Sequence, residues 1–181
     1  MQVNTSKTHP LAVDWLPVTP PGRLGLTMAP GRRQLTKDGS ARWERDVEAD
    51  LLRLHELGCD DLVCLLPATE MQRISAAALP AAASAHGLAF HAHPIPDRGF
   101  IPPSAELAEI VATVVGAVRS GRTVVVHCAG GLGRTGLVTG CALRALGWSA
   151  EDALAELVKA RGPRCPEKEG QRVAIRGFGA E

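Results

Sequence analysis

Hydrophobic and polar positions follow two patterns along the chain: short apolar runs, and longer stretches with apolar residues three or four positions apart. Short apolar runs bounded by turn residues are typical of buried parallel strands, and the longer spacing is typical of amphipathic helices. The runs predict strands within residues 23–31, 61–67, 88–95 and 122–127. The spacing predicts helices over 43–57, 70–86 with an interruption near Pro80, 104–120, 133–147 and 149–160. Because strands and helices alternate, we expect an α/β fold with a mainly parallel central sheet flanked by helices.

The N-terminal segment lacks both patterns and contains the proline-rich stretch WLPVTPPG. Because prolines and glycines interrupt regular structure, residues 1–22 are predicted to form an irregular arm. Residues 23–181 are predicted to form a single domain, since a chain of 181 residues suits one domain with a substantial core.

Composition excludes several partners. A formal charge of +1 and a pI of about 7.7 argue against nucleic acid, whose binding depends on many phosphate contacts from a basic face. No apolar run is long enough to span a bilayer, and the start, MQVNTSKTHP, lacks the apolar stretch of a signal peptide, so membrane insertion is not expected. The five cysteines are scattered, which disfavours a disulfide framework and indicates a reducing cytoplasm. Nothing in the sequence indicates an oligomeric state.

The chemistry of the chain is concentrated in the stretch VVVHCAGGLGRTG, residues 124–136. A strand that enters a glycine-rich loop and then a helix forms an anion site, because the loop amides converge and the helix N-terminus adds positive charge. The predicted phosphate-binding positions are Ala129, Gly130, Gly131, Leu132, Gly133 and Arg134. Unlike nucleotide-binding P-loops, this loop begins with a cysteine and lacks a Gly-Lys-Ser/Thr ending.

Cys128 is predicted to be the nucleophile. Amides and a helix terminus stabilise a thiolate and lower the pKa of a thiol from about 8.5 to roughly 3.5–7.5. Arg134 is expected to bind two phosphate oxygens with its planar fork. A structural cysteine beside a tight turn is the competing interpretation, which the combination of His127, the glycines and Arg-Thr disfavours. Since the amides and Arg134 neutralise phosphate themselves, neither a metal nor another cofactor is expected.

The segment HCAGGLGRT fits His-Cys-x5-Arg-Ser/Thr, the active-site motif of the protein tyrosine and dual-specificity phosphatases. The loop GGLGR and the upstream HAHPIPDRGFIP resemble, more narrowly, the kinase-associated, cyclin-dependent kinase inhibitor 3-like phosphatases. The resemblance extends over about residues 24–178 and is specific around residues 94–103 and 127–136. It implies hydrolysis of phosphomonoesters on proteins through a phosphocysteine.

Asp97, on a Pro/Gly-rich loop, is the predicted general acid and base, and the resemblance supports it because the family's acid lies on this kind of loop. Asp60 and Asp61 are competitors, but both precede a strand and are expected at the sheet's opposite edge. The resemblance also implies that Thr135 donates a hydrogen bond to the sulfur. His127 is expected to brace the backbone beside the cysteine rather than to carry protons.

Three further residue sets have open alternatives. Gln171 resembles a glutamine of the family beside the pocket and is a candidate for positioning water, or else a solvated helix residue. Cys64 is a candidate for a protective disulfide with an oxidised Cys128, although a small core residue is the better interpretation. His91 and His93 share a strand face, but no third metal ligand is evident, so a pocket-wall or packing role is favoured.

The chain contains no tyrosine, and its few aromatic residues lie mostly outside the predicted pocket, which indicates a shallow site. We therefore predict a phosphorylated protein substrate, with phosphotyrosine and phosphoserine/threonine both accepted. A phosphoinositide or other small phosphomonoester is the alternative, weakened because the loop lacks lysines. A non-catalytic phosphoprotein-binding module is the second alternative, disfavoured because Cys128, Arg134, Thr135 and Asp97 occur together. Rhodanese and arsenate reductase fit the loop less well.

Overall fold

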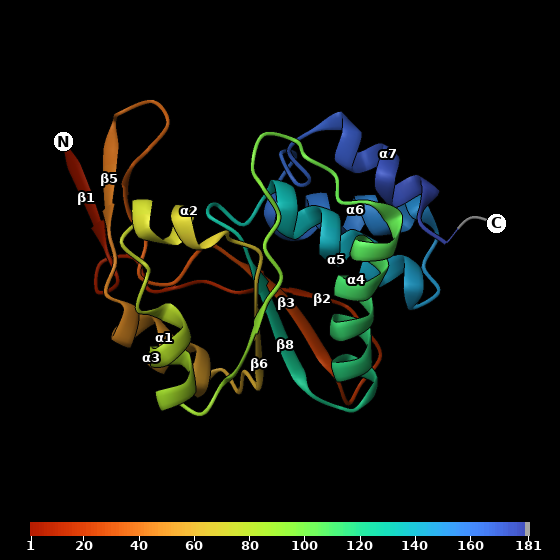
Figure 1. Cartoon of the computed structure of the whole chain (residues 1–181), viewed down its shortest axis with the longest axis horizontal. Helices are drawn as coiled ribbons and strands as arrows, with labels where there is room; N and C mark the ends of the chain where they lie inside the picture. The colour runs from red at the N-terminus through yellow and green to blue at the C-terminus, as the bar shows by residue number, and fades with distance from the viewer. Residues whose placement is uncertain (180–181) are drawn as a thin grey trace.

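A five-stranded sheet forms the centre of the computed structural model, which describes residues 1–179 (Figure 1). Its strand order is β2-β3-β8-β6-β7. The strands are β2 (Asp14–Leu16), β3 (Arg23–Thr27), β8 (Thr123–His127), β6 (Asp61–Cys64) and β7 (Ala89–Ala92). Only β2 runs antiparallel to its neighbour, β3, while the other neighbouring pairs are parallel. The predicted α/β fold with a mainly parallel sheet is therefore confirmed, with a mixed edge.

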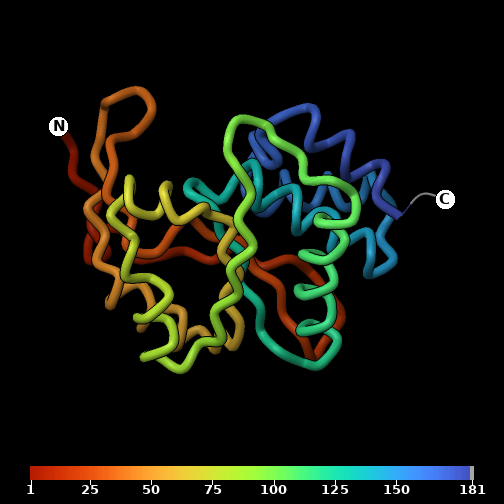
Figure 2. The backbone as a smooth tube through the Cα atoms, viewed as in Figure 1, coloured from red at the N-terminus to blue at the C-terminus, as the bar shows by residue number. Residues whose placement is uncertain are grey.

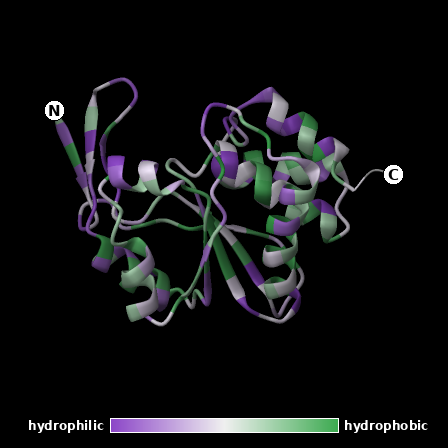
Figure 3. Cartoon of the chain, viewed as in Figure 1, coloured by the Kyte–Doolittle hydropathy of each residue, from purple (hydrophilic) through white to green (hydrophobic). Residues whose placement is uncertain are grey.

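Helices cover both faces of this sheet, as Figure 1 shows. One face packs on α4 (Ser104–Arg119), α5 (Gly133–Ala145), α6 (Ala150–Arg161) and α7 (Glu169–Gly177), and the other on α1 (Val47–Glu56) and α3 (Leu79–Ala85). Successive strand residues point to opposite faces, so Val124 and Val126 join the first core and Val125 joins the second. Hydrophobic residues accordingly run along the central strands (Figure 3).

The sheet brings the carboxyl ends of three parallel strands to one edge. His127 at the end of β8 is in register with Thr27 of β3 and with Cys64 of β6. The loop that follows β8 therefore begins between the segments that follow β3 and β6. The short helix α2 (Ala68–Arg73) lies in the segment after β6.

The prediction of an irregular arm over residues 1–22 is wrong in part, because the arm contains two strands. One of them, β2, extends the main sheet, and β1 (Gln2–Thr5) joins a second sheet of order β1-β5-β4. The other members of the second sheet are β5 (Ala41–Glu44) and β4 (Arg33–Leu35). The strands of this second sheet are short and mix polar with apolar residues, so they form no apolar run in the sequence. They are held by backbone pairing with distant partners. The predicted single domain of residues 23–181 stays a prediction, and its last two residues lie outside those described.

One helix boundary also differs from the predictions. The helix expected from residue 43 begins at Val47, because the Asp46 side chain accepts a hydrogen bond from the Ala49 amide and caps it, while Trp43 belongs to β5. The predicted interruption near Pro80 is confirmed, since α2 ends at Arg73 and α3 begins at Leu79 with Pro80 in its first turn, where proline is favoured. Helix α7, near the C-terminus, and β1 lie at opposite ends of the molecule (Figure 2).

A buried ion pair joins the second sheet to α1. Arg45 Nε and Nη2 donate to the two Asp50 carboxylate oxygens at 2.7 and 2.8 Å, and both side chains are 1% exposed. Asp50 also accepts from the Gly31 amide, and Arg45 donates to the His9 carbonyl. The pair thereby links α1 to the segment after β1, through His9, and to the segment after β3, through Gly31.

Asp50→Asn is expected to lower the free energy of unfolding by about 3–5 kcal/mol, because it leaves the Arg45 charge buried without its counter-ion. Urea denaturation measures this loss. Glu44→Gln, which breaks an exposed pair with Arg42, is the matched control and is expected to change the value by less than about 1 kcal/mol. Equal, small effects of the two changes would show that the buried pair adds nothing to stability.

Candidate active site

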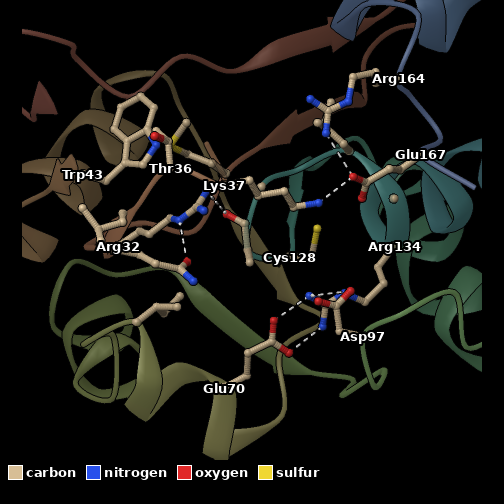
Figure 4. A pocket seen from close by; sticks show the side chains of 18 of the residues that line it. Arg32, Thr36, Lys37, Trp43, Glu70, Asp97, Cys128, Arg134, Arg164 and Glu167 are labelled. Carbon is tan, nitrogen blue, oxygen red and sulfur yellow. Dashed lines mark hydrogen bonds and ion pairs between the residues drawn. The ribbon is translucent and has the colours of Figure 1, made fainter. Parts of the chain in front are cut away.

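The loop of residues 128–132 joins β8 to the first turn of α5 and curls around the Cys128 sulfur (Figure 4). The Gly131 amide donates to Cys128 Sγ at 3.3 Å. Gly131 has a φ of +74°, and a Cβ there would lie 2.4 Å from the Thr27 carbonyl oxygen. Only glycine fits this position, so the sequence of the loop is set by its shape.

The carbonyl groups of the loop are held from outside. Arg161 donates to the Gly130 carbonyl at 2.8 Å and to the Gly131 carbonyl at 3.2 Å, and it pairs with Asp14 of β2 at 2.9 Å. The N–H and C=O of one trans peptide point in opposite directions. Holding these carbonyls outward therefore turns the amides of Gly131 and Leu132 toward the sulfur. Sequence reasoning missed Arg161 and Asp14, which come from distant parts of the chain.

Cys128 is the one described cysteine whose pKa is lowered. Burial raises the pKa of this thiol, but the Arg134 charge and hydrogen bonds from Thr135 and the Gly131 amide outweigh burial, so the net shift is downward. At the four other cysteines burial dominates and raises the pKa, to about 11 at Cys64 and to about 12 at the rest. The environment thus favours one thiolate among five thiols.

Arg134 lies at the N-terminus of α5 with its fork held in place. Nη1 and Nη2 donate to the two Glu70 carboxylate oxygens at 2.8 and 2.7 Å, and Nη1 also donates to the Ile95 carbonyl at 2.9 Å. A guanidinium has five N–H donors. Nε–H and the second Nη2–H remain without a hydrogen-bond partner among residues 1–179, and they form one planar edge of the group. This edge can bind two phosphate oxygens while the other edge stays on Glu70.

Glu70 is a site residue that sequence reasoning missed. It belongs to α2, is buried, and accepts both bonds that orient Arg134. A signal was available, since Glu70 shortly follows the strand predicted within residues 61–67, and the carboxyl ends of parallel strands lie at the same sheet edge as the loop. The sequence could not show that its carboxylate turns toward Arg134.

Glu70→Gln is expected to lower kcat/KM for p-nitrophenyl phosphate by about 10- to 100-fold, because Arg134 loses its charged support and the edge facing phosphate is no longer fixed. Steady-state kinetics and inhibition by orthovanadate measure the effect, and weaker vanadate inhibition of protein that is still folded at the assay temperature indicates a positioning role. Glu167→Gln removes another carboxylate of the pocket that does not contact Arg134, and it serves as the control. Equal losses in the two variants would contradict this role for Glu70.

Asp97, the predicted general acid, lies on the loop between β7 and α4. The loop is anchored two residues earlier, where Ile95 is buried and its carbonyl binds Arg134. The Asp97 carboxylate is 65% exposed, and Oδ1 lies 3.8 Å from Arg134 Nη2. It therefore faces the part of Arg134 that remains available to phosphate, at the mouth of the pocket (Figure 4).

Asp60 and Asp61 lie at the opposite edge of the sheet, as expected. Asp61 opens β6 and binds His91 at 2.8 Å and Arg122, and Asp60 accepts from the Thr123 amide at 2.8 Å. His91 is thus part of a hydrogen-bonded cluster with Asp61, and burial lowers the pKa of His93. Within residues 1–179 no three ligating side chains are grouped in a way that could hold a metal ion.

His127 and Thr135 flank the sulfur from the strand and from the helix. His127 Nδ1 donates to the Cys128 carbonyl at 3.0 Å, because a carbonyl oxygen can only accept. Burial lowers the pKa of His127, which favours the neutral ring and fits a brace. The buried Thr135 hydroxyl has no other hydrogen-bond partner among the described residues, so its proton can turn to the sulfur.

Gln171 is also brought to the site, from α7. Its side chain is buried, its Oε1 accepts from the Lys168 amide at 3.0 Å, and its Nε2 lies beside Gly133. Cys64 is buried at the end of β6, with its sulfur 3.9 Å from Met71 Sδ, and all five cysteines are free thiols. A water-positioning role for Gln171 stays a prediction. Cys64 belongs to the buried core, which fits the favoured interpretation of a small core residue, and the alternative of a Cys64–Cys128 disulfide stays untested.

The sulfur opens into a cavity of about 790 Å³. Beyond the loop, Arg134 and Asp97, its walls come from the β4–β5 hairpin and from the segment before α7. As expected, the aromatic residues lie mostly outside the pocket, and among the described residues only Trp43 of β5 lines it. No helix within the described residues is long and apolar enough to cross a membrane.

Comparisons with known proteins agree with this architecture. The family model of cyclin-dependent kinase inhibitor 3 (CDKN3) matches residues 2–154. Cyclin-dependent kinase inhibitor 3 of Sus scrofa is 31% identical over 137 residues, covering 74% of this chain and 61% of the relative, and that of Homo sapiens is 30% identical over 158 residues, covering 84% and 71%. The chain thus spans about three fifths of the length of the pig relative.

Two solved structures extend the comparison. Kinase-associated phosphatase, with serine in place of its catalytic-site cysteine, is 28% identical with a TM-score of 0.82, covering 93% of this chain and 94% of the other. The active form of Tk-PTP is 27% identical with a TM-score of 0.66, covering 87% and 91%. The match of the family model over most of the sequence, together with these relatives, shows that the chain belongs to the cyclin-dependent kinase inhibitor 3 family.

Proposed function

We propose that the protein is a cysteine-dependent phosphatase that hydrolyses phosphomonoesters on phosphoproteins, at phosphotyrosine and at phosphoserine or phosphothreonine. The observation that carries this proposal is the Cys128 thiol, whose pKa is lowered by Arg134, Thr135 and a loop amide at the floor of an open cavity. The names of the solved relatives, kinase-associated phosphatase and Tk-PTP, support the same reaction class.

The first chemical step forms a sulfur–phosphorus bond. The Cys128 thiolate attacks phosphorus in line while the bond from phosphorus to the ester oxygen breaks, and Asp97 gives its proton to that leaving oxygen. The loop amides and the edge of Arg134 bind the three remaining oxygens and stabilise the charge that they carry in the transition state. The products of this step are the free alcohol or phenol and a phosphocysteine.

The second step returns the enzyme to its starting state. A water molecule attacks phosphorus, its proton passes to the Asp97 carboxylate, and the sulfur–phosphorus bond breaks to release phosphate and the thiolate. Thr135 assists by hydrogen-bonding the departing sulfur, and Gln171 lies where it could orient the water. Both steps require a reduced thiol, so we place the activity in the cytoplasm.

A substrate panel tests this proposal with wild type and Cys128→Ser. The substrates are p-nitrophenyl phosphate in EDTA, phosphotyrosyl, phosphoseryl and phosphothreonyl peptides, and soluble inositol phosphates. We expect turnover of p-nitrophenyl phosphate that EDTA leaves unchanged, turnover of the peptides, and none in Cys128→Ser. Faster turnover of inositol phosphates than of every peptide would reject the protein substrate, and peptide binding without any turnover would reject catalysis.

A further inference from the structure

The cations that line the cavity differ in whether a carboxylate neutralises them. Three of them are ion-paired: Lys37 and Arg164 both bind Glu167, at 2.8 and 3.0 Å, and Arg134 binds Glu70. Three others, Arg32, Arg73 and Lys168, have no carboxylate within 4.0 Å among residues 1–179. Arg73 and Lys168 are exposed, so water solvates them. Arg32 alone in this second group is half-buried.

Arg32 lies at the rim of the phosphate-binding loop. Its Nη1 donates to the Ala129 carbonyl at 3.3 Å and lies 4.0 Å from the position of a Cβ on Gly130. Its Nε donates to the Gln34 side chain at 3.3 Å. The remaining donor group, Nη2, makes no hydrogen bond with the described residues. Figure 4 shows Arg32 on the side of the pocket that also carries Trp43.

The surroundings of Arg32 favour an anion that the protein itself does not supply. Burial is the main influence on this guanidinium and lowers its pKa, while the charges of Cys128 and Glu70 act in the opposite direction. A partly desolvated guanidinium with neutral hydrogen-bond acceptors only is stabilised when an anion reaches its free donors.

This anion is not the phosphate that reacts. In the proposed mechanism the reacting group is bound by loop amides and by Arg134, whereas Arg32 contacts the Ala129 carbonyl, which points opposite to the Gly130 N–H of the same peptide. An acidic side chain one or two residues from the phosphorylated residue can reach Arg32 while the phosphate lies in the loop, because consecutive Cα atoms are about 3.8 Å apart. The cavity of about 790 Å³ extends over this wall and has room for it.

We propose that Arg32 binds a second anionic group of the substrate, a carboxylate or a second phosphate adjacent to the phosphorylated residue, and so selects phosphopeptides with an acidic neighbour. This assignment rests on the proposed protein phosphatase activity and names the substrate class of the same site. Because a guanidinium binds both groups in the same bidentate manner, the experiment separates the two sources.

The test compares kcat/KM for three peptides that differ at one position only, the one next to the phosphorylated residue. That position holds glutamate, glutamine or a second phosphoserine. Wild type is expected to prefer the glutamate or diphosphorylated peptide over the glutamine peptide by about tenfold, the value of one charge-assisted hydrogen bond. Arg32→Gln is expected to reduce this ratio to about one, and Arg32→Lys to an intermediate value. Arg42→Gln makes the same charge change on the same hairpin, outside the cavity, and should retain the preference.

Binding of the same peptides to Cys128→Ser, with and without Arg32→Gln, provides a second measurement that is independent of turnover. An acidic preference that persists in Arg32→Gln would overturn the proposal. So would an equal loss on p-nitrophenyl phosphate and on the acidic peptide, which would place Arg32 among the groups that hold the reacting phosphate. Failure of wild type to hydrolyse any peptide would reject the protein phosphatase itself, whereas equal hydrolysis of all three peptides would reject only the role of Arg32.

Discussion

Cys128→Ser is expected to lower kcat for p-nitrophenyl phosphate by at least about 10⁴-fold, as loss of the nucleophile does in hydrolases that form a covalent intermediate. The reason is ionisation: Arg134, Thr135 and the Gly131 amide stabilise a thiolate at this position, but a serine hydroxyl stays protonated in the same surroundings. Because the side chains have nearly the same shape, the loop should still bind anions. Steady-state kinetics measures the loss, and titration with tungstate shows that binding remains.

Cys59→Ser is the matched control for this change. Cys59 is buried at the other edge of the sheet, just before β6, where burial raises the pKa of its thiol to about 12. We expect near-normal kcat in this variant, even if it is less stable. Retention of more than one hundredth of the activity in Cys128→Ser, or a comparable loss in Cys59→Ser, would remove the nucleophile from the mechanism.

Asp97→Asn is expected to lower kcat by about 10²–10⁴-fold with phenyl phosphate, whose leaving oxygen needs a proton, and by much less with p-nitrophenyl phosphate. In both proteins, activity should rise with pH as Cys128 ionises, with a midpoint below that of an ordinary thiol because the pKa of Cys128 is lowered.

Asp38→Asn is the control for this second change, since Asp38 also lines the mouth of the cavity as an exposed carboxylate. Hydrogen bonds from Thr36 and Ser40 lower the pKa of Asp38 to about 2, so it carries no proton to donate near neutral pH. If Asp97→Asn were as fast as wild type on phenyl phosphate, another group would be the acid.

The parts of the site that the sequence predicts are those encoded by neighbouring residues. A strand, a glycine-rich loop and a helix follow one another from Val124 to Ala145, so Cys128, Arg134 and the amides between them could be placed together from their order alone. Placing Asp97 at the site required the additional inference that its loop follows a strand whose carboxyl end lies at the same edge of the sheet. Its location at the pocket mouth matches that prediction, while its proton transfer stays to be measured.

The supporting groups could not be predicted, because each reaches the site from a different part of the chain. Glu70 and Arg134 are 64 positions apart, and Asp14 and Arg161 are 147 apart. Charged residues of this kind are usually solvated, and only the fold decides which of them turns inward. The strands β1 and β2 were missed for a related reason, since their residues are paired with distant backbone rather than marked by an apolar run.

The support of the loop by Arg161 and Asp14 has a consequence during synthesis on the ribosome. The nucleophile is translated well before the residue that holds the Gly130 and Gly131 carbonyls outward, and Asp14 is translated long before either. A nascent chain that has not yet reached residue 161 therefore has the sulfur without a finished ring of amides around it. Reactivity of this thiol toward phosphate esters should arise late in translation, as a long-range contact closes between the first and last parts of the fold.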